Sequence, residues 1–360
     1  MVSDVRRRMW LLFHRSVYWG VGAGARDGTL GSMTANTLRL RSPADVVSAI
    51  PYLVGFHPAD SVVVLGCGGT DGPYAIRLDL TAQDALVEHV AGLVARRASA
   101  DVIVAGYGPG HRVTPMVERV RDHLSGHGVR LREALRIEGG RFWSYLCSDP
   151  ACCPAEGTHV DVRSSAVAAA ATAGGMVALA DRGELERMIE PTGGECMRQA
   201  TDRAERRFAT WVDDGVEAVP GRMAREGVPL VRIVIERARA GSGPPSDDEV
   251  AWLGVLMVSL RVRDEAWVRM DEADLGTHIR LWRDVLRRVA EPYAAGPASL
   301  LAFAAWRAGE GALANIALDR ALSADPGYSM ARLLHELFIS GLPPWSVPMN
   351  ITPDQLDEVG

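Results

Sequence analysis

The first third of the chain alternates short apolar runs with segments whose apolar residues recur at helical spacing. The runs Ser61–Leu65 and Tyr74–Leu80 are rich in β-forming residues and are joined by a turn of glycine and aspartate, which predicts a β-hairpin. Between Asp84 and Arg97 the apolar positions predict one buried face of a helix. A buried-strand run at 101–108 and a second helix at about 114–125 follow.

Two further strand patterns, at 129–137 and 141–146, complete the order ββαβαββ. Strands that alternate with helices predict an α/β layer with some parallel pairing, here finished by antiparallel strands. Upstream, Ser42 and Asp45 resemble a capping box, with Pro43 at the first helical position. A short helix should start there and stop near Pro51. The predicted fold class is therefore α/β, with a mixed, partly parallel sheet flanked by helices.

After Cys153 the pattern becomes helical, and strand signals almost disappear. The segment 229–237 is ambiguous between helix and strand, and the Gly, Pro and Ser residues at 238–249 make the best linker candidate. The segment 317–331, ALDRALSADPGYSMA, is similar to the second helix and turn of a tetratricopeptide repeat. Only one such unit is visible, so it is either a helical hairpin that caps its own domain or part of a partner-binding groove.

These patterns divide the chain into four parts. We expect a loosely ordered extension at 1–32, an α/β domain at 33–160, a helical region at 161–345 that ends in the tetratricopeptide-like hairpin, and a flexible tail at 346–360. Met33 is a plausible alternative start.

Composition narrows the range of chemistries. The chain has 360 residues, of which 48% are hydrophobic, so it can bury more than one core. All 39 basic residues are arginine, which excludes a Walker A phosphate loop and Schiff-base or pyridoxal phosphate chemistry, because each needs a lysine. The net charge of −6 makes nucleic acid a poor partner.

Neither a signal peptide nor a membrane span is predicted. His14 and Arg15 interrupt the apolar run near the amino terminus before it reaches the length of a signal sequence. No apolar stretch is long enough to cross a bilayer. We therefore expect a cytoplasmic protein with no membrane partner, in which free thiols are more common than disulfides.

Three segments together carry a family resemblance. They are RSPADVVSAIPYLVGFHPADSVVVLG, GGRFWSYLCSDPACCPAEGTHVD and GEGALANIALDRALSADPGYSMARLL. In this order they resemble the bacterial domain-of-unknown-function family 4192, which is common in high-GC Gram-positive bacteria. The resemblance covers about residues 39–345. It implies a domain start near Met33 and brings no established activity.

A cysteine-rich segment is the first candidate site. Its pattern is C-x4-C-C-x5-H, and the candidate metal ligands are Cys147, Cys152, Cys153 and His159. Zinc prefers four nitrogen or sulfur ligands, often from C-x2-C pairs. Adjacent cysteines point apart in extended backbone, so one ion would take Cys147, one of the vicinal pair and His159. The alternatives are a thiol–disulfide role and a structural loop stiffened by Pro150 and Pro154.

A second group of candidates comes from two turns beside predicted strands. In GFHPADS, His57 could act as a general base or ligand oriented by Asp60, although Pro58 also suits a purely structural turn. The segment VAGYGPGHR links a strand to a helix, where open α/β sheets bind ligands. It lacks the dinucleotide fingerprint, so it is either a looser anion site that uses His111 and Arg112 or a simple turn.

Alternate residues on two predicted strands supply the rest of a pocket. Arg77 and Asp79 share one strand face, and Arg141, Trp143 and Tyr145 share another. If both strands border one cleft, it would be lined with aromatic and arginine side chains, although buried core aromatics are commoner. The complete set of candidate ligand-binding residues is His57, Asp60, Arg77, Asp79, Tyr107, His111, Arg141, Trp143 and Tyr145.

Two function hypotheses remain, and no catalytic residue is assigned. In the first, the α/β domain binds a small molecule in this pocket, and an enzyme would require His57, Arg77, Asp79, His111 and Arg141 to converge. In the second, the protein is a scaffold or regulator whose helices after Ala298 bind a protein partner through an exposed apolar groove. Zinc is the one cofactor that the sequence suggests.

Overall fold

A computed structural model of the chain forms two compact units, Met1–Leu185 and Glu186–Gly360. The residues that the structure describes are 9–13, 17–19, 38–67, 73–97, 101–348, 352 and 355–356. Within the extension predicted for 1–32, only 9–13 and 17–19 are described, and both are strands. The rest of that extension, Met33 and most of the predicted tail lie outside the described residues.

The first unit is built on a mixed seven-stranded sheet, as predicted. In spatial order its strands are β1 (Met9–Phe13), β5 (Tyr74–Asp79), β4 (Ser61–Cys67), β6 (Asp101–Tyr107), β7 (Leu131–Glu138), β8 (Arg141–Ser144) and β9 (Thr158–His159). In this sheet β6 and β7 pair in parallel, and the other neighbours pair antiparallel. A separate parallel pair joins β2 (Val17–Trp19) to β3 (Leu38–Leu40). The predicted hairpin is the β4–β5 pair.

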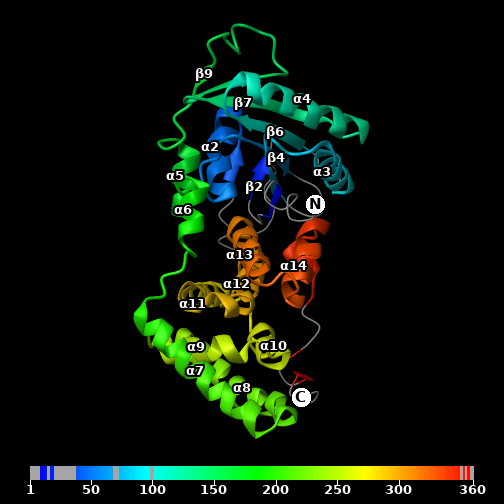
Figure 1. The fold of residues 1–360 in the computed structure, drawn as a ribbon. Coiled ribbons are helices and arrows are strands. Elements are labelled where there is room, and N and C mark those ends of the chain that lie inside the picture. The colour runs from blue at the N-terminus through cyan, green and yellow to red at the C-terminus, as the bar shows by residue number, and fades with distance from the viewer. Residues whose placement is uncertain are drawn as a thin grey trace, which may run out of the picture. The chain divides into compact units, whose positions relative to one another are not determined.

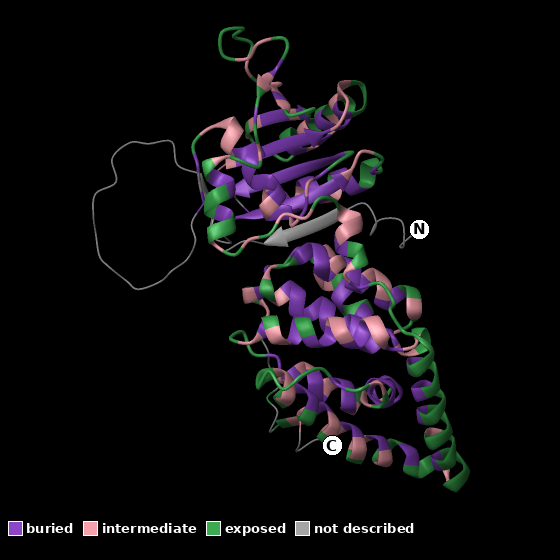
Figure 2. Cartoon of the chain, turned by 90° about the vertical axis from the view of Figure 1, so that its left-hand side faces the viewer, coloured by how far each residue is buried: buried purple, intermediate pink, exposed green. Residues whose placement is uncertain are grey.

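Helices cover both faces of this sheet (Figure 1). One face carries α4 (Gly110–Gly126), which packs beside α3 (Asp84–Arg96). The close approach of α4 depends on Gly106 in β6, because a Cβ atom there would collide with Val113 of the helix. The opposite face carries α2 (Pro43–Val54) and, beside it, α5 (Ala166–Ala173). The strands between these helices are largely buried (Figure 2).

The start of α2 follows the sequence pattern, whereas its end does not. Ser42 Oγ accepts from the Asp45 N–H at 3.2 Å, and Asp45 Oδ2 accepts from the Ser42 N–H at 3.1 Å, so the capping box is complete. The predicted stop near Pro51 is wrong, because α2 continues to Val54 and ends at Gly55, whose φ is 88°. Proline removes one helical donor only, and the buried residues beyond it hold the last turn in place.

The second unit is helical. Its α-helices are α7 (Glu195–Asp214), α8 (Val219–Arg239), α9 (Asp247–Leu256), α10 (Leu260–Val268), α11 (Leu275–Arg288), α12 (Ala295–Ala308), α13 (Gly311–Ala324) and α14 (Ser329–Ser340). Short 3-10 turns occur at Val216–Ala218, Glu291–Tyr293 and Pro344–Ser346. The helix α6 (Arg182–Arg187) contains the residues at which the first unit ends and the second begins in the sequence.

Two features of the helical region settle sequence ambiguities. The segment 229–237 is helical, as part of α8. The linker candidate at 238–249 connects α8 to α9 inside the second unit, with a capping box between Ser246 and Glu249 at the start of α9.

The predicted hairpin corresponds to α12, α13 and α14, which pack on one another. Its likeness to a tetratricopeptide repeat stays a prediction.

Candidate functional site

A cavity of about 330 Å³ lies between α2 and the end of the sheet where β6 and β7 terminate. We call it the α2 cavity. Its walls are Val47 and Pro51 of α2, residues 57–60 before β4, Tyr107 and Gly108 after β6, the β7–β8 turn at 137–140, and Val160 and Val162. The carboxyl ends of parallel strands are where open α/β sheets bind ligands, so the sheet topology favours this position.

Tyr107 supplies an unusual polar group to this cavity. It is the last residue of β6, opposite Ser61 in β4 and Ile137 in β7, and its side chain is only 7% exposed. Its hydroxyl has no hydrogen-bond partner among the described residues. Burial raises the pKa of Tyr107, so the hydroxyl remains a protonated donor. Buried hydroxyls without a protein partner are uncommon, and this one belongs to a residue that lines the cavity.

His57 also lines this cavity. Its backbone N–H donates to the Leu179 carbonyl at 3.0 Å, and Phe56 forms an isolated parallel bridge with Leu179. The histidine is partly buried. Burial and, to a lesser extent, the nearby charge of Arg163 lower the pKa of His57. The imidazole is therefore neutral at neutral pH and can both donate and accept a hydrogen bond.

Asp60 forms the rim of the cavity and is paired with a cation. Its Oδ1 accepts from Arg112 Nη1 at 2.6 Å. The φ of Asp60 is 43°, which is uncommon outside glycine, and Gly108, whose φ is 132°, lies close to it. Because Arg112 pairs with Asp60, its guanidinium group is already occupied and is not available to an anion. One of the two residues predicted for the anion site, Arg112, is thus already paired.

Arg77 and Asp79 point to the same side of the sheet as Tyr107 but do not line the cavity. They form an ion pair with 2.8 Å between Arg77 Nη1 and Asp79 Oδ1. Arg77 is 5% exposed, and its guanidinium lies 5.9 Å from the ring centre of Phe56. Burial lowers the pKa of Arg77, and the Asp79 carboxylate opposes this effect. This pair is a core interaction beneath Phe56.

Arg141, Trp143 and Tyr145 lie on the opposite face of the sheet, beside α4. The Tyr145 hydroxyl shares a 2.7 Å hydrogen bond with Thr114 Oγ1 of α4. Trp143 stacks under Arg136, whose Cζ lies 3.8 Å from the indole centre. Side chains on opposite faces of a sheet cannot line one cleft, so the predicted aromatic pocket does not form. Of the five residues that an enzyme was expected to bring together, only His57 lines the α2 cavity.

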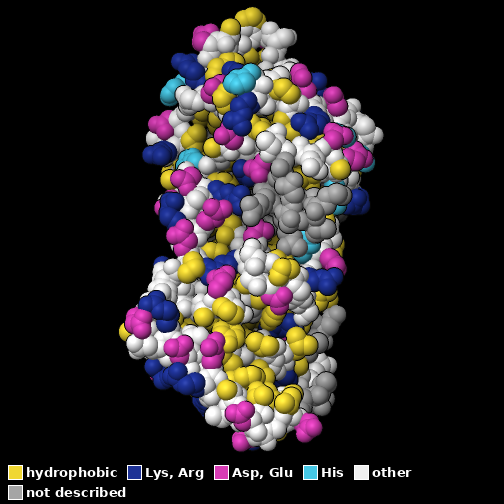
Figure 3. All heavy atoms as spheres, viewed as in Figure 1, with side chains coloured by type: hydrophobic (Ala, Val, Ile, Leu, Met, Phe, Trp, Pro, Cys, Tyr) yellow, Lys and Arg dark blue, Asp and Glu magenta, His cyan; other side chains and the backbone are white. Residues whose placement is uncertain are grey.

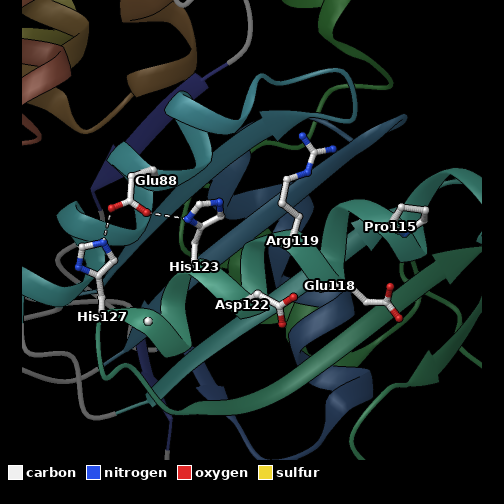
Figure 4. A pocket seen from close by; sticks show the side chains of 8 residues that line it. Glu88, Pro115, Glu118, Arg119, Asp122, His123 and His127 are labelled. Atoms are coloured by element: carbon white, nitrogen blue, oxygen red, sulfur yellow. Dashed lines mark hydrogen bonds and ion pairs between the residues drawn. The ribbon is translucent and has the colours of Figure 1, made fainter.

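A second, more open pocket of about 680 Å³ lies between α3 and α4 (Figure 4). His123 contacts two carboxylates of α3, with Nδ1 2.6 Å from Glu88 Oε2 and Nε2 3.0 Å from Asp84 Oδ1. His127 Nε2 lies 2.9 Å from the other oxygen of Glu88. Hydrogen bonding to Asp84 and Glu88 raises the pKa of His123, and the two histidines lower the pKa of Glu88. We interpret this group as an electrostatic clasp between two helices.

Neither histidine of this clasp was predicted as a site residue. The sequence does carry a signal, because His123 and His127 are four residues apart in a helical segment and so share one helix face. The carboxylates opposite them come from a different helix. Which face of α3 meets α4 is decided by tertiary packing, and the sequence pattern alone did not reveal it.

The cysteine-rich segment forms a loop that follows β8, and residues 145–157 are called the cysteine loop below. The Sγ atoms of Cys147, Cys152 and Cys153 all lie within 4.8 Å of one another. The expectation that vicinal cysteines would point apart is therefore wrong, because these residues lie in a tight turn and not in extended backbone. His159 is in β9, opposite Arg141, and does not belong to this sulfur group.

Of the helices after Ala298, α12 is buried and α14 exposes Leu333, so the docking groove stays a prediction. Every residue of α12 from Ala295 to Trp306 is buried, and α12 packs against α11, α13 and α14. On the face seen in Figure 3, hydrophobic side chains gather instead over the end of the helical unit where α8 and α10 lie. The exposed large apolar residues there include Ile233, Val258 and Leu260.

The fold and cavity define a two-unit protein in which an α/β unit with a ligand-sized cavity precedes an all-helical unit. The family model for a domain of unknown function, DUF4192, matches residues 43–345, and the chain belongs to this family. Comparison with curated proteins and with solved structures found no match. Within the described part of the chain, every helix is too short or too polar to span a bilayer.

Proposed function

We propose that the protein binds a small, uncharged and mainly apolar molecule in the α2 cavity. The observation that carries the proposal is Tyr107, which lines the cavity and whose buried hydroxyl has no partner among the described residues. A buried donor that forms no hydrogen bond costs the folded state about 1–3 kcal/mol. A ligand that accepts this hydrogen bond would recover that cost, so ligand binding accounts for a group that the free protein leaves unsatisfied.

The walls of the cavity indicate the chemistry of the ligand. Most of its side chains are apolar, such as Val47, Ile137 and Val160. No arginine is among the described residues that line it, and its two carboxylates, Asp60 and Glu138, are paired with Arg112 and Arg136, so the lining offers little to attract an anion. Neutral His57 adds a second hydrogen-bonding group to the lining. The ligand should therefore carry a carbonyl or a similar acceptor on an apolar frame that fits a cavity at the small end of the usual range.

The test is a screen of uncharged carbonyl-containing fragments by ligand-observed NMR. It compares the wild type with the variants Tyr107→Phe, Ala59→Trp and Tyr145→Phe. Tyr107→Phe removes the donor and keeps the ring, so it should weaken a specific fragment about tenfold, the worth of one hydrogen bond. Ala59→Trp places a large side chain at the exposed rim and should abolish binding. Tyr145→Phe is the matched control, because its hydroxyl lies on the opposite face and bonds to Thr114.

Two results would contradict the proposal. The first is a set of fragments whose affinity is the same for the wild type, Tyr107→Phe and Ala59→Trp. The second is the absence of any fragment that binds the wild type and is lost in Ala59→Trp. Circular dichroism of each variant establishes that its fold is retained before binding is compared.

A further inference from the structure

The three sulfur atoms of the cysteine loop are brought together by one tight turn. The Asp149 carbonyl accepts from the N–H of Cys152 at 3.1 Å and from the N–H of Cys153 at 2.7 Å. The Asp149 side chain adds a third bond, since its Oδ1 accepts from the Ala151 N–H at 2.9 Å. These bonds fold the chain back on itself, so that Cys152 and Cys153 both reach Cys147.

Both ends of the cysteine loop are fixed to β8 and its neighbour. At the start, the Cys147 N–H donates to Ser144 Oγ at 3.0 Å, and Ser144 Oγ donates to Glu133 Oε1 at 2.8 Å. At the end, Trp143 Nε1 donates to the Ala155 carbonyl at 2.9 Å, and Arg141 Nη1 donates to the Gly157 carbonyl at 2.8 Å. Arg141 and Trp143 thus hold the cysteine loop in place, which is a different role from the ligand binding predicted for them.

A glycine completes this anchorage. The φ of Gly157 is 80°, and a Cβ atom there would collide with the indole of Trp143. The loop can therefore close onto β8 only because residue 157 has no side chain. A loop held at both ends loses little further conformational entropy when its side chains bind an ion. It should therefore bind the ion more tightly than a mobile loop would.

The sulfur geometry is close to that of a metal–thiolate site. In a tetrahedral zinc site the Zn–S bonds are about 2.3 Å, so two ligating sulfurs lie about 3.8 Å apart. The three Sγ atoms, all within 4.8 Å, need to contract by only about 1 Å to reach this spacing.

We propose that Cys147, Cys152 and Cys153 bind a zinc ion as three thiolates, with the fourth coordination position open to solvent. Cys152 is exposed, and the other two cysteines are partly exposed, so an ion can enter directly. Each thiol releases its proton to solvent as it binds, and no electron is transferred. Three protein ligands with one open position are typical of zinc sites that bind water or a further ligand, whereas structural zinc sites use four. This site is separate from the α2 cavity and does not depend on it.

The experiment measures zinc by elemental analysis in full-length protein purified without chelators or metal-affinity resin. Wild type should carry about one zinc ion per chain, and Cys147→Ser and Cys153→Ser should lose most of it. Cys196→Ser is the matched control, because Cys196 is an exposed free cysteine of α7 outside the sulfur group. His159→Ala should also keep its zinc, since His159 is not part of the group.

A second measurement needs no variant and so does not depend on whether one folds. Metal-free wild-type protein is titrated with cobalt(II), and thiolate-to-cobalt charge-transfer absorption should rise to a plateau at about one equivalent. Zinc should then protect the three cysteines, but not Cys196, from a thiol reagent. Zinc well below one equivalent with no charge-transfer band overturns the proposal. Equal zinc in the Cys153→Ser and Cys196→Ser proteins, or a disulfide among the three cysteines by mass spectrometry, also overturns it.

Discussion

Replacing Tyr107 by phenylalanine should make the free protein more stable, which is the reverse of what removing a buried hydroxyl usually does. The hydroxyl is buried and unpaired among the described residues, so the folded state carries its desolvation cost without a compensating bond. That cost is about 1–3 kcal/mol, and phenylalanine removes it while keeping the ring. Allowing for the small void left by the oxygen, we expect the free energy of unfolding to rise by about 1 kcal/mol.

Tyr145→Phe is the natural comparison, because it makes the same chemical change in the same unit. The Tyr145 hydroxyl shares a 2.7 Å hydrogen bond with Thr114, so its loss should lower the free energy of unfolding by about 1 kcal/mol. Differential scanning calorimetry should show one transition that moves in opposite directions in the two variants. For a unit of this size, each shift is about 2–4 °C.

The outcome bears directly on the proposed function. If Tyr107→Phe destabilises the protein as much as Tyr145→Phe does, the Tyr107 hydroxyl already has a partner in the free protein. The reasoning that assigns this hydroxyl to a ligand would then be refuted. If the Tyr107→Phe protein is instead more stable and no longer binds the fragments, the Tyr107 hydroxyl lowers stability but is needed for binding. This is the relation between stability and function expected at a binding site.

Three other changes test the electrostatics and packing. His123→Gln should lower stability at pH values below the raised pKa of His123 and have less effect above it. The clasp raises the folded-state pKa of His123, so its contribution is complete below about pH 6.5 and disappears as pH rises through the raised value, as urea unfolding at several pH values would show. Burial would raise the pKa of Glu265, but hydrogen bonds from three arginines lower it to about 2. Glu265→Gln should therefore cost about 3–5 kcal/mol in chemical denaturation, and an effect below about 1 kcal/mol would contradict this account. Gly157→Ala should displace Trp143 and increase amide exchange in the cysteine loop, whereas Gly139→Ala, with a φ of 58° and open space around it, should leave that loop unchanged.

The order of elements from β4 to β8 was predictable because each of them carries its own local signal. The β-rich runs of β4 and β5, the helical spacing of α3 and the capping box of α2 are short-range patterns, and all of them are confirmed. The misplaced end of α2 shows the limit of such rules. Proline weakens a helix locally, but burial of the residues after Pro51 outweighs that effect, and burial is a property of the folded unit.

The candidate sites depended more strongly on tertiary structure. Alternation along a strand showed that Trp143 and Tyr145 share a face, but not that this face is opposite the one that carries Tyr107. The cysteine spacing suggested a metal site with one vicinal ligand, whereas the turn at Asp149 brings all three sulfurs together. Neither the assignment of strand faces nor the conformation of that turn follows from residue spacing.

By itself, the sequence determined the α/β and helical character of the two regions, the family resemblance and the exclusion of lysine-dependent chemistry. These follow from local periodicity and composition, which need no knowledge of distant contacts. Only the tertiary structure decided that Tyr107 and His57 share a cavity and that His123 meets Asp84 and Glu88. The physical reason is that strand order and helix placement bring together residues far apart in the chain, and the free energy of that packing is not encoded in any single segment.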